Sequence, residues 1–329
     1  MSIVFEAVSK KYGQVQALDA VSFSLNPGDV LGYIGPNGAG KSTTMRILCG
    51  LVKGYSGQVL VDGLNIEQSR GELHRRIGFV PQDAGFQEWR SVRHALRTFG
   101  LLSGLRGAVL DQRIEDVLKR LELAEVAKRR ILTLSGGMRQ RLRFAQALLH
   151  DPAILILDEP LNGLDPASRY QFRQLIRELS GKGRIIIFSS HILNEMEDLA
   201  NRIAILHQGK LRRIGTPDEL RAEYGLGLVV EIESRQSAEL QADWFDAVPL
   251  DRLDLPEMQV SMPTAAESGS PGGGPRLARL HLKPGTDAEA CMPAIMQALA
   301  IHNIGLRSLR HVVPSLEDMY LALTGGEAV

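Results

Sequence analysis

The chain has 329 residues, of which 44% are hydrophobic and 23% charged, a composition typical of a folded globular protein with room for two domains. Its 38 basic and 38 acidic side chains cancel, so no overall charge attracts it to nucleic acid or to an anionic membrane surface. No window approaches the ~20 consecutive apolar residues of a membrane-spanning helix, and no apolar run of signal-peptide length opens the chain.

The first part of the chain carries a strand pattern. Val21, Phe23 and Leu25 alternate with serines and then meet the turn-forming residues 26–29, which predicts a half-buried strand ending in a turn. Val59 and Val61 precede another turn and predict a second strand of the same small antiparallel sheet.

Three other apolar runs, residues 30–34, 154–157 and 185–188, lack this alternation and end in polar or glycine-rich turns. Such runs are typical of strands in a parallel sheet that is covered on both faces. Ligands of these sheets bind beyond the carboxyl ends of the strands. We therefore expect a functional site where the three runs end.

The first run leads into the phosphate loop, residues 35–43 (GPNGAGKST), which fits the pattern G-x-x-x-x-G-K-[ST] between a strand and a helix. The glycines allow backbone N–H groups to surround phosphates, the lysine reaches the β- and γ-phosphates, and the serine hydroxyl ligates Mg²⁺. The residues expected to bind phosphate groups here are Gly35, Asn37, Gly38, Gly40, Lys41, Ser42 and Thr43.

Residues 83–133 have a helical pattern. Ile114, Val117, Leu118 and Leu121 recur at helical spacing, with charged residues between them, which predicts an amphipathic helix with a solvated outer face.

The LSGG segment, residues 134–141 (LSGGMRQR), follows this helical stretch. Ser135 is a plausible N-cap, and Gly136 and Gly137 expose backbone N–H groups at the start of an apolar-striped helix. The segment therefore predicts a second anion-binding helix start. Because the phosphate loop already supplies one such site, a second site requires a second phosphate group.

Two carboxylates follow the second buried run. Asp158 and Glu159 come directly after residues 154–157, and successive side chains of a strand point to opposite sides. We expect the two carboxylates to divide the chemical work between them.

The phosphate loop, the LSGG segment and the acidic strand end, in this order, resemble the ATP-binding cassette (ABC) family. The resemblance implies an α/β P-loop NTPase fold over residues 1–218, with a mixed or parallel sheet core, a small antiparallel β subdomain and a helical subdomain at about 83–150. It also implies that two subunits form a sandwich around two ATP molecules. Ser135, Gly136 and Gly137 of one subunit then close over the γ-phosphate bound by the other.

By the same resemblance, Asp158 holds Mg²⁺ and Glu159 polarises the attacking water. Four further positions match the family. Gln82 senses Mg²⁺ and the water, His191 contacts the γ-phosphate, Asp165 lies where the chain crosses to the partner subunit, and Tyr12 stacks on adenine.

Two positions depart from the family pattern. Met138 stands where the family usually has glutamine, and Leu161 replaces a threonine or serine. Neither belongs to the main phosphate or magnesium contacts, and some export-type members share Met138, so we expect hydrolysis to survive.

Residues 219–329 lie beyond the cassette pattern. Apolar positions predict strands near residues 229–232, 277–282 and 304–313 and a helix over 288–300, with a flexible linker at about 261–276. Residues 314–321 predict a short helix that resembles the last helix of ABC ATPases from the drug, polysaccharide and lipid exporter group. We expect an accessory or regulatory α/β domain.

The leading functional hypothesis is the ATPase subunit of an exporter, with the permease on a separate chain that docks near residues 83–97. A complete set of site residues favours a homodimer, and no nucleic-acid partner is expected. The alternative is a soluble ABC ATPase that acts on ribosomes or DNA. The two cysteines, Cys49 and Cys291, match no metal-ligand spacing and suit a reducing compartment. We expect a cytoplasmic protein held at the membrane by its permease.

Overall fold

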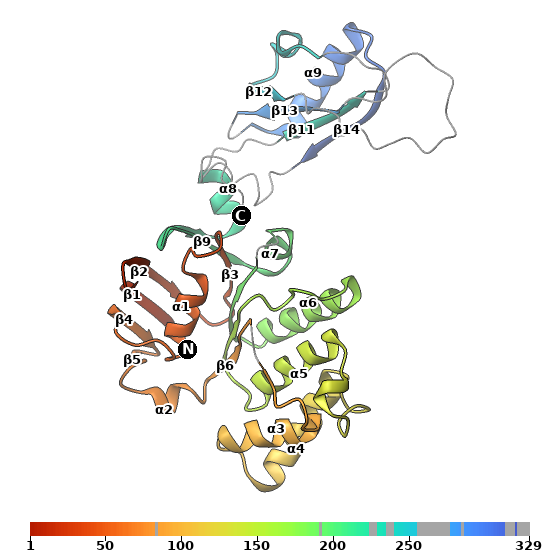
Figure 1. The fold of residues 1–329 in the computed structure, drawn as a ribbon. Helices are drawn as coiled ribbons and strands as arrows, with labels where there is room; N and C mark the ends of the chain where they lie inside the picture. Colours follow the sequence, from red (N-terminus) through yellow and green to blue (C-terminus); the bar gives the residue numbers. More distant parts are fainter. Residues whose placement is uncertain are drawn as a thin grey trace. The chain divides into compact units, whose positions relative to one another are not determined.

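The computed structural model describes residues 1–82, 85–190, 193–223, 229–234, 240–254, 277–283, 286–312 and 320. The chain divides into two compact units, one within Met1–Pro217 and one within Asp218–Gly326. Each unit has its own core of buried apolar side chains, and Figure 1 shows both units with many of their helices and strands labelled. Among the described residues, no helix is long and apolar enough to cross a membrane.

The first unit begins with an antiparallel sheet in the order β2-β1-β4-β5. The rings of Phe5 and Phe23 stack across β1 and β2, with 4.5 Å between their centroids. The two strands predicted around residues 21–25 and 59–61 are confirmed in one sheet, and β1 pairs with both of them. The strand bounds are Ile3–Tyr12 (β1), Val15–Leu25 (β2), Ser56–Val61 (β4) and Leu64–Asn65 (β5).

The second sheet of this unit has the order β10-β9-β3-β8-β7-β6. The five strands from β9 to β6 are parallel, and β10 adds an antiparallel edge. The three predicted runs form its neighbouring central strands β3, β8 and β7, in which every residue is buried. The bounds are Val30–Ile34 (β3), Ile77–Val80 (β6), Ile154–Leu157 (β7), Ile185–Ser189 (β8), Arg202–His207 (β9) and Lys210–Gly215 (β10).

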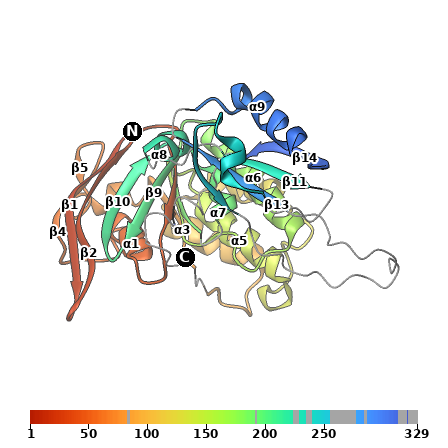
Figure 2. The ribbon, with the colours of Figure 1, turned by 90° about the horizontal axis from the view of Figure 1, so that it is seen from above.

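Helices cover both faces of the parallel sheet. Leu31 and Tyr33 of β3 share a core with α1 (Lys41–Leu48) and the antiparallel sheet. Gly32 between them faces α7 (Leu193–Leu199), because a Cβ atom there would lie 2.6 Å from the Met196 sulfur. On the face opposite α1, α5 (Gly136–Leu148) contacts β6 and α6 (Pro166–Ser180) contacts β8; Figure 2 shows these layers from above. A short α2 (Arg70–Leu73) precedes β6, and α8 (Pro217–Glu223) follows β10.

The helical part of the unit consists of α3 (Val92–Leu102), α4 (Gly107–Arg120) and a single turn η1 (Ile131–Thr133), packed against α5. The amphipathic helix predicted from the apolar spacing is confirmed, since Ile114, Val117 and Leu118 are all buried on α4. Leu121, the fourth position of that pattern, lies just beyond the helix as its C-cap and is buried as well.

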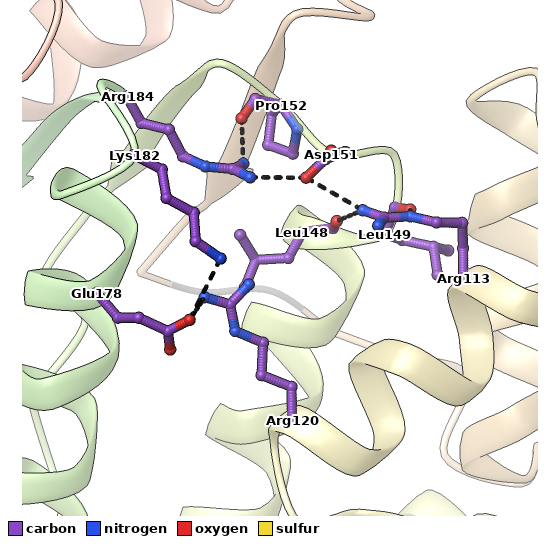
Figure 3. Close-up of polar contacts among 9 residues, drawn as sticks. All are labelled: Arg113, Arg120, Leu148, Leu149, Asp151, Pro152, Glu178, Lys182 and Arg184. Carbon is purple, nitrogen blue, oxygen red and sulfur yellow. Dashed lines mark hydrogen bonds and ion pairs between the residues drawn. The ribbon is translucent and has the colours of Figure 1, made fainter.

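A network of charged side chains ties α4 to the sheet-bearing part of the unit (Figure 3). Arg113 of α4 donates from Nε to the carbonyl oxygen of Leu149 at 3.0 Å and lies 3.3 Å from the Asp151 carboxylate. Arg184, next to β8, holds the other side of Asp151 at 2.7 Å. Arg120, at the end of α4, pairs with Glu178 of α6 at 2.9 Å.

The second unit is an antiparallel sheet, β12-β13-β11-β14, covered on one face by α9. Val230, Ile232 and Leu280 point towards Ile295 and Leu299 of α9 in its core. The predicted strands and helix are confirmed, whereas β12 and the η2 turn were not expected. The predicted linker at about 261–276 and the helix at 314–321 fall outside the described residues, apart from Tyr320. The bounds are Val229–Ser234 (β11), Ala242–Phe245 (η2), Leu250–Asp254 (β12), Leu277–Leu282 (β13), Ala288–Ile301 (α9) and Leu306–Val312 (β14).

Candidate functional site

The phosphate loop connects β3 to α1, at the carboxyl edge of the parallel sheet. Two positions of this loop have no room for a side chain and therefore require glycine. A Cβ atom on Gly40, whose φ is 110°, would lie 2.5 Å from the carbonyl oxygen of Ala17, and one on Gly35 would lie 2.3 Å from that of Leu206. Asn37 and Gly38 lie exposed at the tip of the loop. The loop therefore presents backbone N–H groups and the start of α1 at one place, which is the arrangement that binds phosphate.

Lys41 is the first residue of α1, and only 7% of it is exposed. Its ammonium group donates to the carbonyl oxygens of Gly35 and Pro36, the latter at 3.2 Å. Burial lowers the pKa of Lys41, and the nearby carboxylates of Glu159 and Asp158 partly offset this effect. The predicted phosphate-binding lysine and the two predicted carboxylates thus form one electrostatic cluster. Ser42 and Thr43 follow in the first turn of α1, half-buried.

Asp158 directly follows β7 and is 2% exposed. Its Oδ1 accepts a hydrogen bond of 2.8 Å from the Ser189 hydroxyl, at the end of β8. The same hydroxyl accepts a 2.9 Å bond from the backbone N–H of Glu159. Ser189 was not among the predicted site residues, since a serine at the end of an apolar run carries no signal of its own.

Glu159 has a φ of 48°, in the left-handed region that a residue with a side chain rarely adopts and that costs roughly 1–2 kcal/mol. Its Oε2 accepts bonds from the side-chain amides of Gln82 at 3.0 Å and Asn162 at 3.3 Å. The expectation that strand alternation separates the two carboxylates is wrong, because β7 ends at Leu157 and the chain turns at Glu159. Gln82 thus contacts this carboxylate directly, while its predicted role towards Mg²⁺ and the attacking water stays a prediction.

The LSGG segment and Asp165 form a second group of site residues. Ser135 caps α5, accepting a bond from the backbone N–H of Met138 at 3.3 Å, as predicted. Asp165 caps α6 and accepts from the backbone and hydroxyl of Ser168 at 3.0 and 2.7 Å, and these bonds lower its pKa. A Cβ atom on Gly137 would lie 3.2 Å from the Ser168 hydroxyl, so the two helix starts are neighbours. Ser135 and Gly136 are exposed.

Gln140 connects the two groups, and the sequence did not reveal this role. It is 6% exposed on α5, and its side-chain amide donates at 2.7 Å to the carbonyl oxygen of Pro160, directly after Glu159. Leu161 is 2% exposed, so the position where the family usually carries a hydroxyl is occupied here by a buried apolar side chain.

Tyr12, the predicted adenine contact, ends β1 with 48% of its surface exposed. The ammonium group of Lys10 lies 5.0 Å from the centre of its ring. The same group donates to the carbonyl oxygens of Lys53 at 2.6 Å and Gly54 at 3.0 Å. One cation therefore contacts both the ring and the segment that follows α1, and the role of Tyr12 in stacking stays a prediction.

Two predicted features lie wholly or partly outside the described residues. His191 lies outside the described residues. Of the predicted docking region, residues 83–97, the structure describes 85–97, where Trp89 is 65% exposed and lies against the Arg90 guanidinium. The bridge between Ser91 and Arg130 places Trp89 across from Leu132, which is also exposed. Two exposed apolar side chains, Trp89 and Leu132, therefore lie at or next to the predicted docking region, whose role stays a prediction.

Comparison with known proteins places this site in a family. The ABC transporter family model matches residues 18–162. The chain is 32% identical over 323 residues to the linearmycin resistance ATP-binding protein LnrL of Bacillus subtilis (strain 168), with 97% of each chain covered. It is 33% identical over 325 residues to the daunorubicin resistance ATP-binding protein DrrA2 of Streptomyces coeruleorubidus, covering 97% of this chain and 94% of that one.

A solved structure described as an ATP-binding subunit of an ABC transporter matches with a TM-score of 0.64 and 29% identity, covering 69% of this chain and 94% of that one. The solved subunit thus leaves about a third of this chain unmatched, whereas the alignments to the two resistance proteins extend through both units. The predicted α/β cassette fold is confirmed by this match. The chain therefore belongs to the ABC transporter family, as an ATP-binding subunit that hydrolyses ATP.

Proposed function

We propose that two copies of this chain close around two ATP molecules and drive a separate membrane permease. The single observation that carries the proposal is the division of the site into two groups. Lys41, Asp158, Glu159 and Gln82 cluster at the phosphate loop, and the exposed LSGG helix start lies beside Asp165. An exposed helix N-terminus attracts phosphate groups. The phosphate group that the LSGG helix start would bind is the γ-phosphate of the ATP held by the partner copy.

Within each phosphate loop, backbone N–H groups and Lys41 hold the β- and γ-phosphates, and Tyr12 stacks on the adenine. The hydroxyl of Ser42 and the carboxylate of Asp158 are hard oxygen donors that suit Mg²⁺, and the burial of Asp158 beside Lys41 fits a site that binds both a cation and phosphate. When bound, Mg²⁺ neutralises charge on the phosphates.

Hydrolysis then rests on Glu159 as the group that polarises the attacking water. The amides of Gln82 and Asn162 orient its carboxylate. We assign His191, on the segment after β8, to the γ-phosphate. The chemistry is mainly positioning and charge stabilisation, as in other phosphoryl transfers.

The transport direction proposed is export. Two relatives that align over nearly the whole chain are named as resistance ATP-binding proteins, one for linearmycin and one for daunorubicin. We propose an antibiotic-like small molecule as the cargo class, a permease docked near residues 83–97, and an accessory role for residues 219–329. None of the three reported matches concerns ribosomes or DNA, so the alternative function gains no support from them.

The test is Glu159→Gln in the full-length chain. The variant keeps the shape and hydrogen-bonding reach of the side chain but loses the base, so ATP hydrolysis should fall by at least ~100-fold while ATP binding persists. With Mg²⁺ and ATP, the variant should elute from size-exclusion chromatography as a dimer, and the wild type as a monomer after turnover.

A matched control is Glu125→Gln, an exposed glutamate on the loop after α4, which should hydrolyse ATP at the wild-type rate. Hydrolysis by Glu159→Gln at the wild-type rate would show that Glu159 is not the base. A variant that binds ATP but stays monomeric would contradict the two-copy sandwich.

A further inference from the structure

We infer that Ser189 is a positioning residue that sets the geometry of Glu159 and Asp158 for hydrolysis; this inference rests on the proposed role of Glu159. Ser189 is the last residue of β8 and is fully buried. Its single hydroxyl bridges the two site carboxylates, donating to Asp158 Oδ1 at 2.8 Å and accepting from the Glu159 N–H at 2.9 Å.

The register of the parallel sheet explains this bridge. Leu157, the last residue of β7, pairs with Phe188 of β8, so Asp158, which directly follows β7, and Ser189, which ends β8, each come one residue after this pair. Side chains at matching positions of adjacent strands point to the same face. Ser189 therefore lies beside Asp158 because of strand pairing, and the turn at Glu159 brings the next N–H group towards the same hydroxyl.

The bond to the Glu159 N–H acts on a strained residue. A left-handed φ of 48° is unfavourable for glutamate and persists only where surrounding groups hold it. Ser189 holds the backbone end, while Gln82 and Asn162 bond to Oε2 at the other end of the same residue. Fixing both ends restricts the carboxylate to one place, which is what a water-activating group requires.

A hydroxyl suits this position because it donates and accepts at once. Alanine at residue 189 would leave a buried carboxylate oxygen without its donor and a backbone N–H without its acceptor. The phosphate loop and Lys41 contribute no atom to either bond, and alanine at residue 189 leaves the Asp158 carboxylate itself in place for Mg²⁺, so nucleotide binding should be spared. The expected signature is a loss of turnover without a loss of ATP affinity.

The experiment compares Ser189→Ala and Ser189→Thr with the wild-type full-length chain. We expect Ser189→Ala to lower kcat by ~10-fold or more, with the KM for ATP unchanged within about 2-fold. Ser189→Thr keeps the oxygen and should restore most of the lost rate. The matched control is Ser234→Ala, since Ser234 is also a buried serine that ends a strand, β11, but lies in the second unit.

Wild-type kcat for Ser189→Ala would overturn the inference. A rise in KM for Ser189→Ala that matches the fall in kcat would also overturn it. A thermally stable Ser189→Thr variant that is as slow as Ser189→Ala would do the same. Either result would indicate a general packing role. The outcome for Glu159→Gln separates the two proposals. If that variant hydrolyses ATP normally, the proposed function fails. If it is inactive while Ser189→Ala is normal, only the role of Ser189 fails.

Discussion

Tyr12 and Lys10 show how an exposed aromatic ring can be held in place at the edge of a site. The Lys10 ammonium contacts the ring and two backbone carbonyls, so its position depends on three partners. A cation over an aromatic ring contributes about 0.5–1 kcal/mol at an exposed position. Part of the ATP affinity should therefore come from a residue that need not touch the nucleotide.

We predict that Lys10→Met raises the KM for ATP by about 2- to 5-fold and leaves kcat unchanged, because the ring loses its cation while the catalytic carboxylates are undisturbed. Steady-state hydrolysis at varied ATP measures both constants. Lys11→Met, which alters the neighbouring exposed lysine, serves as the control and should match the wild type. Equal effects from the two variants would indicate a general loss of positive charge instead.

At the scale of elements, the network of Figure 3 joins α4 to the sheet-bearing part of the first unit. Arg113, from the helix, and Arg184, next to β8, meet at Asp151. The hydrogen bond from Arg184 is the largest influence on the carboxyl group and, with Arg113, lowers the pKa of Asp151. The charged form of Asp151 therefore stabilises the folded state.

The pH dependence follows from the direction of this shift. The folded-state pKa of Asp151 is below its unfolded value of ~3.9. Its contribution to the free energy of unfolding is therefore fully present above the unfolded pKa and is lost as the pH falls through the folded-state pKa. The side chain is 59% exposed, so solvent screening should limit the contribution to less than about 1 kcal/mol.

We predict that Asp151→Asn lowers the free energy of unfolding at pH 7 and that its difference from the wild type shrinks below about pH 4. Asparagine tolerates the left-handed backbone of this residue, whose φ is 57°, so the substitution isolates the charge. Urea denaturation at both pH values gives the comparison. A difference that does not change with pH would show that the carboxylate charge is not involved.

At the scale of the whole molecule, each of the two units has a core of its own among the described residues. The core of the first unit is formed by side chains of the antiparallel sheet, α1 and the parallel sheet. The core of the second unit lies between its own sheet and α9. On the opposite face of that second sheet, Glu231 is almost fully buried and accepts bonds from Arg279 at 3.0 Å and Arg310 at 2.9 Å.

We predict two calorimetric unfolding transitions in the full-length chain, because each unit can lose its core separately. In the Glu159→Gln background, ATP with Mg²⁺ should raise the midpoint of the transition of the first unit by several degrees, since the phosphate loop lies in that unit. Adding Glu231→Gln should lower the other midpoint, because it removes the charge of a buried carboxylate that bonds to two exposed arginines, at a cost of about 1–3 kcal/mol. A single transition that responds to both changes would contradict this independence.

Elements with a strong local sequence pattern could be predicted from the sequence. The continuous runs that became β3, β7 and β8, the apolar spacing of α4 and the Ser135 cap were all recognised, because each depends on residues close together in the chain. The short strands β5, β6 and β12 were not, since two to five residues carry too little periodicity and are stabilised by their neighbours in the sheet.

The same division applies to the site. The sequence by itself determined the phosphate loop, the carboxylate pair and the LSGG helix start, because phosphate and magnesium chemistry requires those residue types at short fixed spacings. Only the tertiary structure decided that Ser189 bridges Asp158 and Glu159, that Gln140 bonds next to them, and that Glu159 adopts a left-handed backbone. Those contacts depend on the register of strands and helices distant in the chain, which packing of the core sets and no local pattern records.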